Sequence, residues 1–168
     1  MRGFFAYLLL LGTTACANPT DGDQPGPGVG DSTADSQDPT VVPPVFTSAL
    51  SSLSVELRSA MSGTTWTHEC PVHLNDLRLL EATYWDYTGA VKTGRLVVAA
   101  SASDTFVKVL KIAFESHFPF ERMDPASAFG GNDDASMAAN NTSAFNCRAV
   151  TGGSSWSQHS YGNAIDIN

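Results

Sequence analysis

The spacing of apolar residues predicts two amphipathic helices. Over residues 47–62, apolar side chains recur every three or four positions, which places them on one face of a helix that ends at Gly63. A second face of this kind extends from about Ser103 to His117, and Ser103 is well suited to cap its N-terminus. The two faces consist of Leu50, Leu53, Leu57 and Met61, and of Phe106, Leu110, Ala113 and Phe114.

Between these segments the pattern changes to that of strands. Leu77 and Leu79 lie in one β-like run and residues 91–99 form another, with the turn-forming residues 87–90 between them, so we predict a β-hairpin. Residues 119–146 read mostly as loop, and strands are predicted again at 145–150 and 162–168. This mixture indicates an α+β fold, in which helices flank a small antiparallel sheet.

Residues 1–16 have the features of an export signal. Arg2 supplies a positive charge, residues 4–11 form an apolar run, and small residues lead to Cys16. The run is shorter than the ~20 apolar residues of a membrane-spanning helix, so a signal peptide is the better interpretation. Small residues before a cysteine resemble the bacterial lipobox, although Thr13 stands where leucine is usual. We expect an exported cell-envelope lipoprotein, anchored to a membrane through lipid on Cys16; an ordinary secretory signal is the alternative.

A polar segment follows the signal. Residues 17–45 consist mainly of proline, glycine, aspartate, serine and threonine, with almost no large apolar side chain. Because such a segment cannot bury enough surface to offset the entropy cost of ordering, we predict a disordered linker. As a flexible coil it would span roughly 30 Å. The folded domain is expected to begin near Phe46.

The charge of the chain argues against nucleic-acid binding. The net charge is −8, and five of the aspartates lie in residues 17–45, where there is no lysine or arginine. The remainder contains no basic patch. Nucleic-acid-binding domains neutralise phosphates with clustered lysine and arginine, so we expect no such partner.

The chain has three cysteines, of which Cys16 is the predicted lipidation site. The other two, Cys70 and Cys147, form an even pair in a protein expected to enter an oxidising compartment, which predicts a disulfide. The alternative is a pair of buried thiols, which export disfavours.

The residues most suggestive of chemistry lie near the end of the sequence, in Ser157-Gln158-His159-Ser160-Tyr161-Gly162-Asn163-Ala164-Ile165-Asp166. A histidine nitrogen and a carboxylate oxygen are good zinc ligands. If residues 162–168 alternate as a strand, Ile165 and Ile167 face the core while Asp166 and Asn168 share the other face. His159, which precedes this strand, would fold back over the face that carries Asp166.

This segment resembles the S-x-H-x-x-G-x-A-x-D motif of the VanY-like cell-wall peptidases, the zinc D-alanyl-D-alanine carboxypeptidases and L-alanyl-D-glutamate endopeptidases. The resemblance extends from about Trp66 to the end of the sequence. Besides the motif, it is carried by Cys70-Pro71, Asp76-Leu77-Arg78, Tyr84-Trp85 and the segments 94–98, 118–119, 121–123, 133–137 and 140–148.

The resemblance implies a site and a reaction. His159 and Asp166 would be two of three zinc ligands, Arg148 would contact substrate or stabilise negative charge, and Ser157 and Gln158 would support the histidine. The reaction would be hydrolysis of a peptidoglycan stem peptide by zinc-bound water, with a carboxylate as general base. For Arg148 a surface ion pair is the alternative.

The sequence departs from the family in one respect. The third ligand and the general base of the family lie in a D/E-x-x-H segment downstream of the motif, and the sequence ends two residues after Asp166. We therefore expect residues 46–168 to be a peptidase-like domain that is incomplete at its C-terminus, with a reading frame that continues to such a segment. A non-catalytic lipoprotein that at most binds wall peptides is the alternative. His68 and His73 would approach Arg148 through a Cys70–Cys147 bridge, but we interpret them as turn residues.

Overall fold

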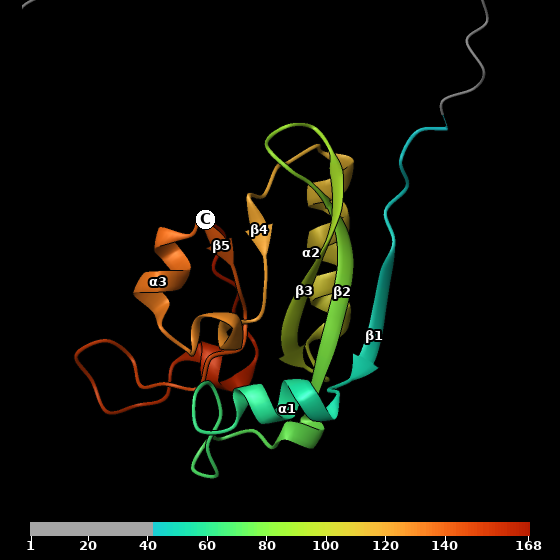
Figure 1. The fold of residues 1–168 in the computed structure, drawn as a ribbon. Coiled ribbons are helices and arrows are strands. Elements are labelled where there is room, and N and C mark those ends of the chain that lie inside the picture. The colour runs from blue at the N-terminus through green and yellow to red at the C-terminus, as the bar shows by residue number, and fades with distance from the viewer. Residues whose placement is uncertain (1–41) are drawn as a thin grey trace, which may run out of the picture. The chain divides into compact units, whose positions relative to one another are not determined.

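The computed structural model describes residues 42–168 (Figure 1). The predicted signal peptide, the lipidation site at Cys16 and the linker as far as residue 41 lie outside the described residues. Within the described part, no helix combines the length and the apolar character needed to cross a membrane.

A three-stranded antiparallel sheet forms the centre of the domain. Its strands β1 (Ser48–Ser52), β2 (Leu77–Trp85) and β3 (Val91–Ala99) lie in the order β1-β2-β3. The predicted hairpin is therefore confirmed, with Trp85 opposite Val91 at its closed end. In the turn, the Asp86 carboxylate accepts hydrogen bonds from the backbone N–H groups of Thr88 (2.8 Å) and Ala90 (2.9 Å).

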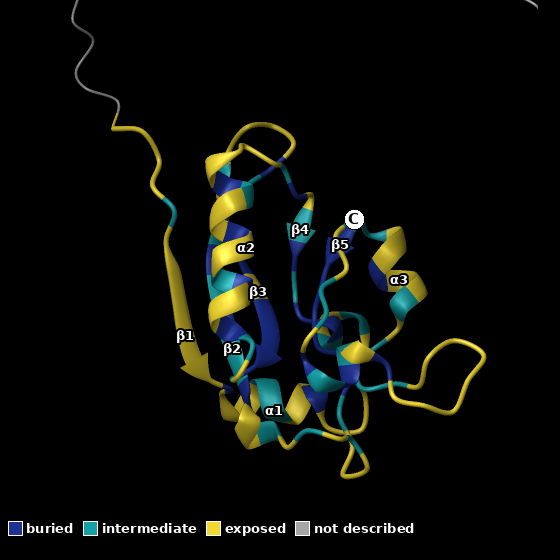
Figure 2. Ribbon diagram, turned by 180° about the vertical axis from the view of Figure 1, so that it is seen from behind, coloured by how far each residue is buried: buried dark blue, intermediate teal, exposed yellow. Residues whose placement is uncertain are grey.

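Helix α2 (Ser103–Glu115) covers one face of this sheet (Figure 2). The predicted apolar face is the one that is buried, and Phe106 and Leu110 belong to a core cluster with Leu80, Leu96 and Val98. The α+β fold with helices flanking a small antiparallel sheet is confirmed by this layer.

The helix predicted over residues 47–62 is wrong in its first half. Residues Ser48–Ser52 form strand β1, which pairs with β2, and only Val55–Met61 form a helix, α1. Ser54 caps this helix, because its hydroxyl accepts a hydrogen bond from the backbone N–H of Leu57 (3.2 Å). Leu50 fits the helical spacing of apolar residues, but it lies on the edge strand β1, where it is 42% exposed.

The region predicted as loop contains short elements that the sequence pattern did not indicate. They are β4 (Arg122–Met123), a 3-10 turn (Ala126–Phe129), α3 (Asp133–Ala138) and β5 (Asn141–Thr142), and β4 pairs with β5 in parallel. A further 3-10 turn, Leu74–Asp76, precedes β2.

The strands predicted at 145–150 and 162–168 are not formed as regular strands. Each segment makes a single bridge, Ala149 with Trp156 and Asp166 with Ser143. Ile165 packs against the core as expected, whereas Ile167 is 45% exposed. The chain leaves the extended path because Gln158–Tyr161 form a 3-10 turn and Gly162 is left-handed.

Strand β3 joins the sheet to the C-terminal part of the domain, which lies on the side away from β1 (Figures 1 and 2). At Gly94, a Cβ atom would stand 2.5 Å from the Cβ of Met123 in β4, so only glycine permits this approach. Further along β3, the Val97 carbonyl accepts a hydrogen bond from the Phe145 N–H (2.9 Å). At the end of β3, the Ala99 N–H donates to the Gly162 carbonyl (3.0 Å).

Candidate functional site

The motif residues 157–162 form a tight turn that is fixed at both ends. The buried Ser157 caps the 3-10 turn, since its hydroxyl accepts a hydrogen bond from the His159 N–H (3.3 Å). Gly162 ends the turn with φ +68°, and a Cβ there would lie 2.5 Å from the Ala99 backbone nitrogen. Both the left-handed conformation and the close approach to β3 therefore require glycine.

His159 and Asp166 face each other, and two adjacent residues hold them there. The His159 Nδ1 lies 2.6 Å from the Ala144 carbonyl oxygen, and the backbone of Asp166 exchanges two hydrogen bonds with that of Ser143 (2.9 and 3.2 Å). The His159 Nε2 then lies 3.3 Å from the Asp166 Oδ2. One short segment, residues 143–144, thus sets the position of both predicted ligands.

The hydrogen bond at Nδ1 decides what Nε2 offers. A carbonyl oxygen only accepts, so Nδ1 carries a proton and Nε2 is the ring nitrogen that faces the carboxylate. At this distance the two groups can form an ion pair when the ring is protonated, or they can both bind one metal ion. The 3.3 Å separation exceeds the ~2.7–2.9 Å of a charge-assisted hydrogen bond. It equals the roughly 3.3 Å edge between two ligands of a tetrahedral zinc ion at ~2.0–2.1 Å.

Arg148 lies beside this pair. A cavity of about 250 Å³ is lined by Arg148 and Asp166, together with Asp133, Asp134 and Asn168. The Arg148 Nε forms an ion pair with an oxygen of Asp133. Its backbone is bound to the turn through Ser160, whose buried hydroxyl accepts from the Arg148 N–H (2.9 Å) and donates to the Arg148 carbonyl (2.8 Å). The structure therefore brings Arg148, His159 and Asp166 together.

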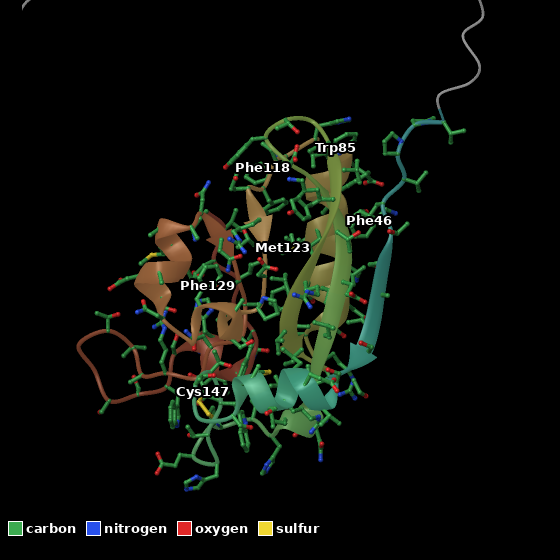
Figure 3. All side chains as sticks on the ribbon, in the orientation of Figure 1. Phe46, Trp85, Phe118, Met123, Phe129 and Cys147 are labelled. Atoms are coloured by element: carbon green, nitrogen blue, oxygen red, sulfur yellow. A yellow bond between two sulfur atoms is a disulfide. The ribbon has the colours of Figure 1, made fainter. Side chains whose placement is uncertain are left out.

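The predicted disulfide is present beside Arg148. Cys70 and Cys147 are joined with a Cα–Cα distance of 6.0 Å, and the bond is visible at the labelled Cys147 in Figure 3. The Cys147 N–H also donates to the Thr65 carbonyl (3.0 Å). The residue preceding Arg148 is thus held to the loop that follows α1.

Other residues of the motif lie apart from this cavity. Gln158 is exposed, and its side chain forms no hydrogen bond within residues 42–168. Tyr161 borders a separate cavity with Asn163 and Asp76. Among the described residues, no group of three histidine, cysteine, aspartate or glutamate side chains is arranged to hold a metal ion, so His68 and His73 do not complete the site.

Sequence reasoning missed three residues that position the site: Asp133, Ser143 and Ala144. Ser143 and Ala144 act through backbone atoms, which leave no mark in side-chain chemistry. Asp133 is visible as an acid near a helix start, but nothing in the linear pattern connects it with Arg148, 15 positions away.

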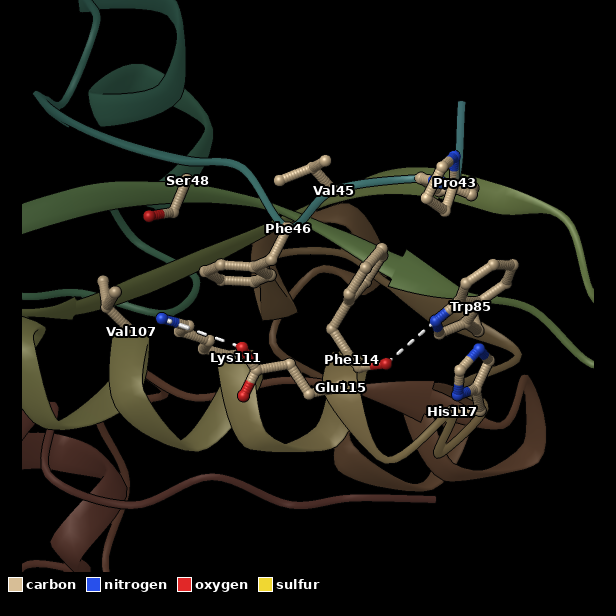
Figure 4. Close-up of a pocket in the computed structure, with 11 residues that line it drawn as sticks. Pro43, Val45, Phe46, Ser48, Trp85, Val107, Lys111, Phe114, Glu115 and His117 are labelled. Carbon is tan, nitrogen blue, oxygen red and sulfur yellow. Dashed lines mark hydrogen bonds and ion pairs between the residues drawn. The ribbon is translucent and has the colours of Figure 1, made fainter. Parts of the chain in front are cut away.

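A larger groove, of about 620 Å³, lies elsewhere in the domain (Figure 4). Pro43, Pro44 and Val45, which the sequence assigned to the linker, border it together with Phe46 and α2. Inside it, Trp85 stacks on Phe114 and His117 and donates a hydrogen bond to the Phe114 carbonyl (2.9 Å). None of the predicted site residues lines this groove.

No protein-family model, no curated protein and no solved structure matches this chain.

Proposed function

We propose that this chain carries two ligands of a zinc peptidase site that acts on peptidoglycan stem peptides in the cell envelope, as its resemblance to the VanY-like peptidases implies. The observation that carries the proposal is the 3.3 Å separation of His159 Nε2 and Asp166 Oδ2, with Nδ1 fixed on a carbonyl. The two residues that the motif predicts as zinc ligands thus have donor atoms at the spacing expected of zinc ligands.

Each residue has a distinct role in the proposed site. His159 and Asp166 hold the metal, and the Ala144 carbonyl keeps the histidine in the tautomer that can bind it. When bound, zinc polarises the scissile carbonyl and lowers the pKa of its water toward ~7. Arg148, which is always charged, binds an anionic group of the peptide in the cavity that Asp166 also lines.

The proposed site needs more than residues 42–168 provide. A catalytic zinc centre has three protein ligands and one open position, and the described residues supply two of them. The third ligand and the general base therefore belong to a D/E-x-x-H segment outside this part of the chain. The alternative function is that of a non-catalytic protein that binds wall peptides, which needs neither a third ligand nor a general base.

The proposed location is the cell envelope, with the protein exported and attached to a membrane through Cys16. The Cys70–Cys147 disulfide supports export, because such bonds persist in oxidising compartments.

Peptide hydrolysis separates the two functions. The coding DNA after codon 168 is first read to its stop codon, and the protein encoded by the complete frame is purified. We expect it to release D-alanine from a synthetic pentapeptide ending in D-Ala-D-Ala, or to cleave within that peptide, when zinc is present. A chelator, His159→Ala and Asp166→Ala should each abolish the reaction, whereas His68→Ala, at an exposed histidine away from the cavity, should retain it.

Two results would contradict the peptidase. One is a stop codon directly after Asn168 together with no zinc-dependent cleavage by the 168-residue chain. The other is cleavage that survives His159→Ala. Peptide binding without cleavage, unchanged by His159→Ala, would establish the alternative function.

A further inference from the structure

We propose that Asp133 is the positioning residue that holds the Arg148 guanidinium in the cavity beside Asp166, ready to bind a carboxylate of the peptide. This inference rests on the proposed function for its substrate, but its structural part can be tested without any peptide.

The Asp133 carboxylate connects two residues of the segment that leads to Arg148. One of its oxygens forms the ion pair with the Arg148 Nε, and the other accepts a hydrogen bond from the Asn146 Nδ2 (2.7 Å). Asn146 is buried, with 4% of its surface exposed, and its Nδ2 also donates to the Gly131 carbonyl (3.2 Å). Asp133 is therefore itself fixed by a buried neighbour.

The place of Asp133 in α3 directs this carboxylate. Asp133 is the first residue of the helix, and the Asn132 side chain caps it by accepting a hydrogen bond from the Ala135 N–H (2.9 Å). The capped start of the helix fixes the backbone from which Asp133 extends. The next residue, Asp134, borders the same cavity but forms no ion pair with any residue of the described range.

The ion pair uses the inner nitrogen of the guanidinium. The buried Arg148 Nε lies against the Asp133 carboxylate as an ion pair and makes no hydrogen bond. Within residues 42–168 the only hydrogen bond of the outer nitrogens is a long one from Nη1 to the Ala149 carbonyl (3.5 Å). The outer edge of the fork is thus available to a carboxylate, which it matches in geometry. An arginine otherwise loses considerable rotamer entropy when it binds, and Asp133 removes this cost in advance.

The backbone of Arg148 is fixed from the opposite side, by the turn that carries His159. Ser160 bonds both its N–H and its carbonyl, and the Ser157 N–H donates to the same carbonyl (3.0 Å). Arg148 therefore extends from the turn of the metal ligands to the start of α3. The backbone of Arg148 is bound to the turn and its side chain to the start of α3. The guanidinium therefore has a defined position relative to His159 and Asp166.

Positioning and simple neutralisation predict opposite results for Asp133→Asn. Positioning predicts that binding of an acetylated tripeptide ending in D-Ala-D-Ala becomes weaker by ~5-fold, since ordering an arginine side chain costs about 1 kcal/mol of entropy. If Asp133 only neutralised the charge of Arg148, its replacement should strengthen peptide binding, because the arginine charge would then be free to attract the peptide carboxylate. Asp134→Asn is the matched control: it removes the same charge from the same cavity, and binding should not weaken. Zinc affinity, measured in parallel, should stay the same in both variants.

A spectroscopic measurement on the full chain decides the structural part alone. Because the Nε of Arg148 is buried against the Asp133 carboxylate, its N–H in the wild-type protein should give a sharp NMR resonance that exchanges with water more slowly than those of the other arginines. Asp133→Asn should remove that protection, and Asp133→Glu, which keeps the charge, should restore part of it.

The outcomes are separable from those of the proposed function. If the wild-type protein binds no peptide, the proposed function fails, while the Nε–H resonance still tests the role of Asp133. An Arg148 resonance without protection in the wild-type protein, or stronger peptide binding by Asp133→Asn, would overturn the inference even if the peptidase is established. The Arg148 resonance is measured in the wild-type protein, so this test remains available if Asp133→Asn does not fold.

Discussion

The two sides of strand β3 are stabilised in different ways. On one side, β1, β2 and α2 form regular ladders and a core of closely packed apolar side chains, such as Leu80, Leu96 and Leu110. On the other side, residues 119–168 contain strands of only two residues, and the chain is held by a disulfide, side-chain hydrogen bonds and a few approaches to β3.

This difference explains where the candidate site lies. Regular strands alternate side chains between two faces, whereas irregular chain can bring His159, Asp166 and Arg148 to one cavity from separate segments. The buried apolar side chains of this region, Phe120, Met123 and Phe145, belong to core clusters shared with the sheet. The covalent and glycine-dependent attachments that keep the region against the sheet should therefore matter most.

Removal of the disulfide should have the largest effect. Cys70 and Cys147 are 77 positions apart, and opening a loop of this length should lower the free energy of unfolding by about 4 kcal/mol in the chain-entropy treatment. Denaturant unfolding of the Cys70→Ser/Cys147→Ser variant measures this. Hydrogen exchange should show faster exchange in residues 143–148 than in the β2–β3 hairpin. Equal loss of protection on both sides of β3 would contradict the comparison.

The second-largest effect on stability is expected where the turn at residues 157–162 lies against β3. Gly162→Ala introduces both a left-handed alanine and a Cβ 2.5 Å from the Ala99 nitrogen, so the free energy of unfolding should fall by about 3 kcal/mol. Gly152→Ala is the matched control, because Gly152 has φ +75° but no atom within 4 Å of a new Cβ. It should cost only about 1 kcal/mol, from strain. Thermal unfolding measures both, and equal costs would show that the turn is not packed on β3 as described.

The smallest effect should come from the hairpin turn, which is independent of the site. The ion pair with Lys92, then the Thr88 hydroxyl and the Ala90 N–H, hold the pKa of Asp86 far below its ordinary value. Because the folded state lowers this pKa, the stabilisation is complete above about pH 4 and is lost as the pH falls toward the folded value. The difference in melting temperature between wild type and Asp86→Asn should therefore shrink below about pH 4.

A matched change keeps this test specific. Glu69→Gln, at an exposed loop position without an ion pair in the described residues, should give a melting-temperature difference that does not shrink in the same way. A difference for Asp86→Asn that grows on acidification would have the wrong sign and would exclude the proposed cause.

The sequence predicted the regular side of β3 better than the other side. Periodicity located the hairpin and α2, because in both the apolar positions are the buried ones. It failed at Ser48–Ser52, where pairing with β2 outweighed a helical spacing that local reasoning could not distinguish from a true helix. Pairing with a strand that lies some 30 residues away is a tertiary gain, absent from the local pattern.

On the irregular side, residue chemistry was more informative than periodicity. The motif indicated His159 and Asp166, the family resemblance implied Arg148, and the structure places these three residues together. The cysteine count indicated the disulfide. The strands predicted at 145–150 and 162–168 were wrong because alternation alone does not provide a partner. Ser143, Ala144 and Asp133 could not be identified, since their roles depend on which segments meet in three dimensions.

If His159 and Asp166 together bind a metal ion, calorimetric titration with zinc of the protein encoded by the complete reading frame should show it. We predict one zinc per chain, with affinity lowered more than ~10-fold by His159→Ala and by Asp166→Ala, and unchanged by the control variants His68→Ala and His73→Ala. Zinc binding of equal strength in all five proteins, or no binding to the wild-type protein, would show that His159 and Asp166 are not metal ligands.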